Sequence, residues 1–134
     1  MKRLTLLGLV LSAALLILAV APAAATARNE FRGAWTGIDG DGSNMKLWFV
    51  QDGWSAGRLI HIRGSDDRTG GWCGGAARMD AIGVLEGDDA LSVSYAWWCL
   101  DPVENILYFY GDTFTYDTSA DTITAMGVEF HRAK

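Results

Sequence analysis

A single alternating stretch decides the fold: residues 91–99 read LSVSYAWWC. The odd-numbered positions are apolar or aromatic, and the even-numbered positions carry Ser92, Ser94, Ala96 and Trp98. A period of two residues is typical of a β-strand that buries one of its faces. Turn-forming residues bound the stretch, with EGDD at 86–89 before it and Asp-Pro at 101–102 after it. The stretch therefore predicts a long strand with one face in a core.

Outward from this strand, short alternating segments and turn residues recur in both directions, and no long segment has a helical period. Further strands are predicted at Phe31–Ile38, Asn44–Gln51, Gly57–Arg63, Ala76–Leu85, Asn105–Tyr110, Thr113–Asp117 and Asp121–His131. Turns are expected at 39–43, 111–112 and 118–120, a bulge at Gly127, and the longest loop at Gly64–Gly75. About eight strands indicate an all-β domain, either an antiparallel up-and-down barrel or a closed sandwich.

The first 27 residues have the pattern of a secretory signal peptide. Two basic residues precede an apolar run, Leu4–Val20, and small residues surround the expected cleavage points after Ala27 or Ala25. An uncleaved signal anchor is the alternative, because the run is near the lower length limit of a membrane span. Pro22 favours cleavage. We therefore expect residues 28–134 to form one secreted or periplasmic domain, with no stable membrane insertion after cleavage.

The charge of the chain argues against a nucleic-acid partner. The sequence has 16 acidic and 11 basic residues, a formal charge of −5. Loss of Lys2 and Arg3 with the signal peptide leaves nine basic residues and a charge of −7. Binding to nucleic acid depends mainly on neutralising phosphates with Lys and Arg, so we expect none.

Two cysteines, Cys73 and Cys99, are the only ones in the chain. In an oxidising compartment they are expected to form one disulfide. Such a bridge closes a loop of about 27 residues, which stabilises a fold by about 3.5 kcal/mol in the chain-entropy model. A redox or metal role requires a CxxC spacing or neighbouring ligands, which these positions lack, so we expect a structural bridge.

Tryptophan is abundant, with six residues in this short chain. Trp48 alternates out of phase with Met45, Leu47 and Phe49, and Trp98 is out of phase with Trp97, so they cannot all face one interior. An exposed aromatic side chain often marks a binding surface. The candidate ligand-binding residues are Trp48, Trp54, Trp72 and Trp98. Alternatively, Trp72 and Trp98 pack around the disulfide.

The segment Gly33-Ala34-Trp35 at the first strand, together with Arg132 at the end of the last, resembles the structural signature of the calycin superfamily. That superfamily includes lipocalins, fatty-acid-binding proteins, avidins and a small periplasmic inhibitor of metalloproteases. The resemblance implies a small barrel in which Trp35 packs across one end and Arg132 stacks on its ring. It also implies that Gly33 permits close packing there. The arrangement of Trp, Asp-Gly-Ser and Cys residues is also similar to that of an uncharacterised family of secreted bacterial proteins.

No motif in the chain is typical of catalysis or cofactor binding. The only histidines, His61 and His131, lie in strand patterns beside arginines and are expected to be solvated. Asp39–Asn44 follows the opening of a calcium loop, but the twelfth position is Val50, so a hairpin turn is expected without a metal. We expect no enzyme activity, no metal and no cofactor.

The function predicted from these features is binding outside the cytoplasm. The first hypothesis is an exported, non-catalytic protein that holds a small apolar or saccharide ligand with aromatic side chains at the open end of the barrel. The alternative is a secreted inhibitor or protein-interaction module that meets an extracellular or periplasmic protein through a loop such as Gly64–Gly75. The sequence leaves the ligand and the partner unidentified.

Overall fold

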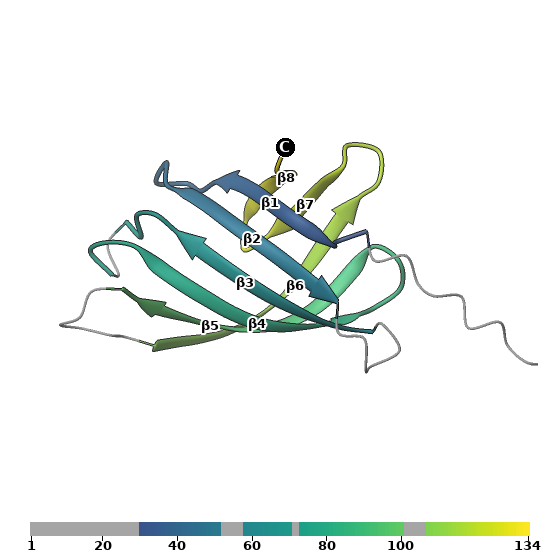
Figure 1. Cartoon of the computed structure of the whole chain (residues 1–134), viewed down its shortest axis with the longest axis horizontal. Helices are drawn as coiled ribbons and strands as arrows, with labels where there is room; N and C mark the ends of the chain where they lie inside the picture. The colour runs from purple at the N-terminus through teal and green to yellow at the C-terminus, as the bar shows by residue number, and fades with distance from the viewer. Residues whose placement is uncertain (1–29, 52–57, 71–72, 101–106) are drawn as a thin grey trace, which may run out of the picture.

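The computed structural model describes residues 30–51, 58–70, 73–100 and 107–134. These residues form eight antiparallel strands that pair in chain order and close into a barrel (Figure 1). The strands are β1 (Gly33–Ile38), β2 (Asn44–Gln51), β3 (Leu59–Asp66), β4 (Ala77–Leu85), β5 (Ala90–Cys99), β6 (Leu107–Asp117), β7 (Thr122–Ala125) and β8 (Val128–Arg132). The predicted all-β up-and-down barrel is confirmed.

Alternation along the strands builds the wall and fills the interior. In β4 every second residue is buried, from Ala77 to Leu85. The inward side chains of Leu47, Ile62 and Met79 are at most 1% exposed, so the barrel is packed with side chains around them. Pairing of β1 with β8, with Trp35 opposite Arg132, closes the ring.

The turn predicted at residues 111–112 is wrong. Gly111 and Asp112 continue β6, where they pair with Ser94 and Val93 of β5. The carboxylate of Asp112 accepts a hydrogen bond from the backbone N–H of Met126 at 2.9 Å. Asp112, which suggested a turn at its own position, therefore stabilises a different turn at Met126.

That second turn replaces the predicted bulge at Gly127 and divides the last predicted strand in two. Met126 and Gly127 have φ values of 54° and 74°. Ala125 pairs directly with Val128, which makes a two-residue hairpin between β7 and β8. Positive φ at both central residues suits the right-handed twist of the strands. The two errors compensate, so the number of strands is still eight.

Several predicted boundaries also shift, two of them by two or more residues within the described chain. Strand β1 begins at Gly33 and not at Phe31. Strand β3 continues to Asp66, because Gly64 and Ser65 pair with Met79 and Arg78 of β4. The loop predicted from Gly64 therefore begins three residues later than expected.

The predicted signal peptide, residues 1–27, lies outside the described residues and stays a prediction. Within the part of the chain that the structure describes, no helix is long and apolar enough to span a membrane.

Candidate functional site

One end of the barrel, here called the Trp35 end, is closed by an aromatic ring under a cation. Trp35 is fully buried, and its indole N–H donates a hydrogen bond to the carbonyl of Phe31 at 2.8 Å. The guanidinium carbon of Arg132 lies 4.2 Å from the centre of the indole ring. This is the contact predicted from the sequence.

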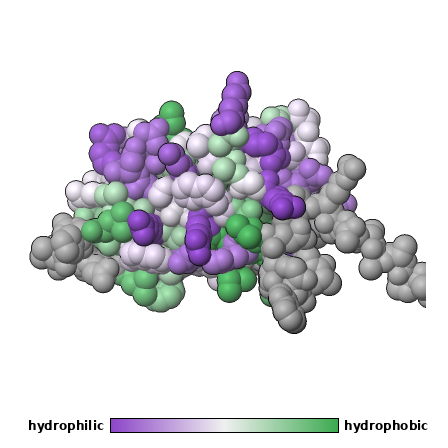
Figure 2. Space-filling model, in the orientation of Figure 1, coloured by the Kyte–Doolittle hydropathy of each residue, from purple (hydrophilic) through white to green (hydrophobic). Residues whose placement is uncertain are grey.

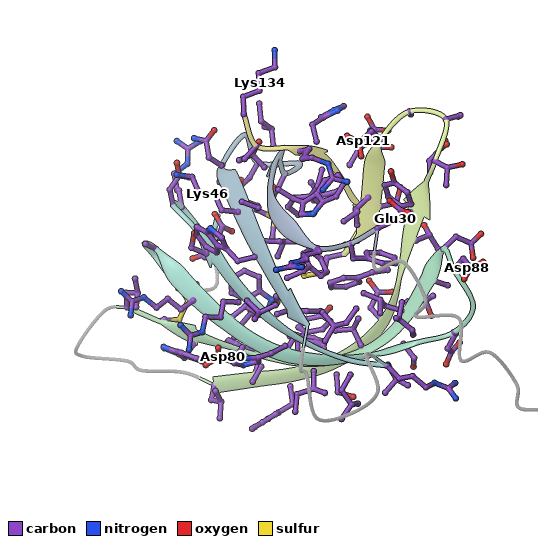
Figure 3. All side chains as sticks on the ribbon, turned by 45° about the vertical axis from the view of Figure 1, so that its right-hand side comes forward. Glu30, Lys46, Asp80, Asp88, Asp121 and Lys134 are labelled. Carbon is purple, nitrogen blue, oxygen red and sulfur yellow. A yellow bond between two sulfur atoms is a disulfide. The ribbon has the colours of Figure 1, made fainter. Side chains whose placement is uncertain are left out.

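Arg132 is held in place by several acceptors. Its guanidinium donates to both carboxylate oxygens of Asp121, at 2.8 and 3.0 Å, and to the carbonyls of Arg32 and Glu30. Hydrogen bonds from Arg132 lower the pKa of Asp121, and the same contacts raise the pKa of Arg132. Figure 3 shows Glu30 and Asp121 on the same side of the barrel. Arg132 thus joins the chain before β1 to Asp121, the residue that precedes β7.

A methyl group at Gly33 would not clash at this end of the barrel. A Cβ at this position would lie 3.6 Å from the nearest atom, an arginine nitrogen of Arg132, which is an ordinary contact. The requirement for glycine comes from the backbone, since Gly33 has a φ of 119°. Residues with a side chain rarely adopt that conformation.

The opposite end, here called the disulfide end, carries the connection between β3 and β4, of which residues 67–70 and 73–76 are described. Cys73 in this segment is bonded to Cys99 at the end of β5, with the two Cα atoms 5.3 Å apart, so the predicted disulfide is confirmed. Hydrogen bonds join Asn44 to the carboxylate of Asp67 at 2.6 and 2.8 Å. The buried Thr69 donates to the carbonyl of Gly75. The segment is therefore tied to the barrel at several points.

A buried carboxyl group lies at this end of the barrel. Asp66 is 4% exposed and accepts one backbone hydrogen bond from Arg68 at 3.0 Å. Burial raises the pKa of Asp66, and the negative charges of Asp39 and Asp41 add to the effect. The carboxylates of Asp39 and Asp41 accept hydrogen bonds from backbone N–H groups of their own hairpin turn.

No metal site is formed by these acids. Among the described residues, no group of three or more His, Cys, Asp or Glu side chains is arranged to hold a metal ion. The two histidines considered in the sequence lie on different strands, His61 on β3 and His131 on β8. His61 has its Nε2 atom 3.8 Å from Asp80, and His131 has its Nε2 atom 3.2 Å from Glu129. Both histidine side chains are about half exposed or more.

Trp48 and Trp98 both lie on the outer wall of the barrel, out of phase with the core as the sequence indicated, and not at an open end. They line one hollow of about 950 Å³ across β2 to β5, which we call the Trp48–Trp98 hollow. The other residues that line it are Val50, His61, Arg63, Gly64, Ser65, Arg78, Met79 and Asp80. Trp48 is 40% exposed, and Trp98 is partly exposed. The other two candidates, Trp54 and Trp72, lie outside the described residues.

Strand register explains why these side chains lie on one outer face. Trp48 is opposite Arg63, which is opposite Asp80. In the next row Lys46 is opposite Ser65, Ser65 opposite Arg78, and Arg78 opposite Trp98. Lys46 and Asp80 point away from the interior (Figure 3). Aromatic and charged side chains are therefore interleaved on one wall.

The neighbouring part of the wall is more apolar. A second hollow of about 630 Å³ lies over β3 to β6 and shares His61 and Asp80 with the first. Its lining includes Phe109, Ile82 and Tyr110, which are 72%, 58% and 52% exposed. Figure 2 shows hydrophobic surface gathered along the lower rim of the barrel, where β4 to β6 lie.

A third hollow, of about 860 Å³, lies near the disulfide end between β1, β2, β3, β4 and β8. It is lined mainly by polar residues and by Met45, Ala77 and Leu100. The described residues place no aromatic ring there apart from the imidazole of His131.

Sequence reasoning did not identify the basic residues of the wall. Lys46, Arg63 and Arg78 occupy the outward phase of their strands, as Trp48 and Trp98 do. Phase along each strand is readable from the sequence, but which outward residues become neighbours depends on the register between strands.

Comparison with known proteins identifies no relative of this chain. No family model, curated protein or solved structure matches it significantly.

Proposed function

We propose that this is an exported, non-catalytic binding protein that holds a saccharide in the Trp48–Trp98 hollow. The observation that carries the proposal is the placement of two partly exposed tryptophans in one hollow beside His61, Ser65 and Asp80. Planar aromatic rings stack on the faces of sugar rings, and the polar side chains supply donors and acceptors for sugar hydroxyls.

A saccharide is favoured over a small apolar ligand by the chemistry of the hollow. Small apolar molecules are bound mainly in enclosed sites lined by hydrophobic groups. The interior of this barrel is filled around Leu47, Ile62 and Met79, and the Trp48–Trp98 hollow is an open, mixed surface. An elongated, hydroxyl-rich ligand suits such a surface better.

The proposal includes export and a calycin-like ancestry. The disulfide between Cys73 and Cys99 is consistent with an oxidising compartment, and residues 1–27 have the pattern of a signal peptide. The closed eight-stranded barrel and the contact of Arg132 with Trp35 support kinship with the calycin superfamily.

A second candidate function, a protein-interaction module, is supported by the exposed Phe109, Ile82 and Tyr110. Exposed apolar patches of this kind mark protein interfaces. The loop first considered for such contact is a weaker candidate, because Asp67 and Cys73 fasten it to the barrel.

The test is a glycan-array screen of neutral and acidic oligosaccharides, followed by calorimetry on the glycan that binds best. Trp48→Ala and Trp98→Ala should each weaken binding by about tenfold, since each removes one stacking surface. Phe109→Ala in the neighbouring hollow is the matched control and should leave binding unchanged.

Three outcomes would contradict the proposal. The first is a wild-type protein that binds no glycan, and the second is affinity that is unchanged in both tryptophan variants. The third is recovery of the glycan in a chemically altered form, which would show that the protein is an enzyme.

A further inference from the structure

We infer that the ligand of the Trp48–Trp98 hollow is an acidic polysaccharide chain. This inference rests on the proposed function and specifies the class of saccharide. It is carried by the charge of the wall, by the order of its side chains and by the length of the surface they form.

The wall has the opposite charge to the protein as a whole. The chain has a formal charge of −5, yet Arg63 and Arg78 line the hollow, and Lys46 projects from the same wall beside it, opposite Ser65. Asp80 is the one acidic residue that lines the hollow, among the residues that the structure describes. A basic surface on an acidic protein attracts an anionic ligand and repels it elsewhere.

Most of this positive charge is not neutralised within the protein. Arg63 reaches Asp80 only at 4.0 Å and has a side chain that is 72% exposed. No ion pair involves Lys46 or Arg78 in the described part of the chain. A guanidinium that is free in this way can bind a carboxylate or sulfate group through two parallel hydrogen bonds.

The side chains form a track and not a single pocket. One row runs from Lys46 through Ser65 and Arg78 to Trp98, across four strands. Neighbouring strands are about 4.8 Å apart, so this row spans roughly 14 Å. A surface of that length with cations between aromatic rings suits several linked sugars that alternate stacking faces with acidic groups.

A nucleic acid fits the same surface less well, although bases also stack on aromatic side chains. One strand of DNA, the form whose bases can stack in this way, carries one negative charge per about 3.4 Å, so about four would lie along this row. Three cations on a protein of net negative charge cannot match that density. A polysaccharide with at most one acidic group per sugar has a lower charge density, which three cations can accompany.

The test compares an oligogalacturonate with its fully methyl-esterified, neutral form by calorimetry at low and at high salt. Wild-type protein should bind the acidic form about tenfold more tightly at low salt, and salt should reduce the difference. Arg63→Gln combined with Arg78→Gln should abolish the preference and retain binding of the neutral form. Arg32→Gln combined with Lys134→Gln removes the same charge away from the wall and should leave the preference intact.

A further variant sharpens the result. Asp80→Asn removes the one carboxylate of the hollow, so it should increase the affinity for the acidic chain several-fold. Trp98→Ala should weaken binding of both forms equally. Unfolding temperatures of the variants at the charged residues should match that of the wild type, because these side chains are exposed.

The failures are distinguishable. Equal affinity for the two forms, independent of salt, would overturn the acidic ligand and leave saccharide binding standing. Absence of binding to either form, together with an empty glycan array, would overturn the proposed function as well. Tighter binding of single-stranded DNA than of the oligogalacturonate would overturn the polysaccharide in favour of a nucleic acid.

Discussion

The two ends of the barrel are closed by different chemistry. At the Trp35 end, a buried indole, a guanidinium and an exposed carboxylate are stacked without any covalent link. At the disulfide end, a covalent bond joins Cys73 to Cys99 at the end of β5, and the carboxyl group of Asp66 is buried at the same end. The first closure depends on packing and ionisation, and the second on the redox state of two sulfur atoms.

The same type of residue responds to the two environments in opposite directions. The pKa of Asp121 is lowered because Arg132 stabilises its charged form. The pKa of Asp66 is raised because burial destabilises its charged form. Acidification should therefore weaken one end of the barrel and relieve an unfavourable charge at the other.

The largest expected effect is at the Trp35 end. Trp35→Ala should lower the free energy of unfolding by about 3–5 kcal/mol, because it removes a fully buried ring and exposes the space beneath Arg132. Urea denaturation followed by circular dichroism measures the change. Trp35→Phe keeps part of the packing but loses the hydrogen bond to Phe31. Its free energy of unfolding should therefore lie between those of the wild type and Trp35→Ala. A cost below about 1 kcal/mol for Trp35→Ala would show that this closure is not important for stability.

Loss of the disulfide should have the next largest effect. Replacing Cys73 and Cys99 together by serine should lower the free energy of unfolding by about 3.5 kcal/mol, since the unfolded chain is no longer constrained. Reduction of the wild-type protein with dithiothreitol should reproduce this loss and should not affect the double variant. If the reduced and oxidised proteins unfold at the same denaturant concentration, the bridge does not stabilise the fold.

The smallest expected effects are changes in stability with pH, which should differ in sign between Asp121 at one end and Asp66 at the other. The stabilisation from Asp121 is present above the ordinary value of 3.8 and is lost as pH falls through its lowered pKa. The unfavourable charge of Asp66 is present above its raised pKa and is removed as pH falls through it. Asp121→Asn should thus destabilise the protein at pH 7, and Asp66→Asn should stabilise it.

The Asp66 difference should disappear below the ordinary value of 3.8, whereas the Asp121 difference should begin to shrink only there and fall further as pH drops towards its lowered pKa. Shifts in unfolding temperature on the order of 4 °C or less are expected, measured by calorimetry at pH 3, 5 and 7. Asp88→Asn, in the turn between β4 and β5, is a control for an exposed aspartate that belongs to neither closure. Shifts of the same sign for Asp66→Asn and Asp121→Asn at pH 7 would contradict the comparison.

Much of this fold was predictable because alternation is a local property. The stretch Leu91–Cys99 has the same inward and outward faces in the structure as in the sequence, and the contact of Trp35 with Arg132 followed from a family resemblance. The turn at Met126 was not predictable from composition, because methionine rarely adopts a positive φ. Its stabilising partner, Asp112, lies 14 residues away.

The candidate site was less predictable than the fold. The sequence indicated that Trp48 and Trp98 do not share the phase of the core, and both lie on the outer wall. Their common hollow depends on three interstrand registers that bring Arg63 and Arg78 between them. Those registers are set by packing of the whole interior, which no single strand pattern specifies.

The closure of β1 against β8 also has a kinetic consequence. The other strand pairings join neighbours in the chain, whereas Arg132 reaches back to the carbonyl of Arg32, 100 residues away. Contacts of long sequence separation are slow to form, so the ring is expected to close after the meander of strands has assembled. Trp97 acquires its partners within that meander, and Trp35 meets Arg132 only on closure. The contact of Trp35 with Arg132 is therefore expected to form in the last step of folding.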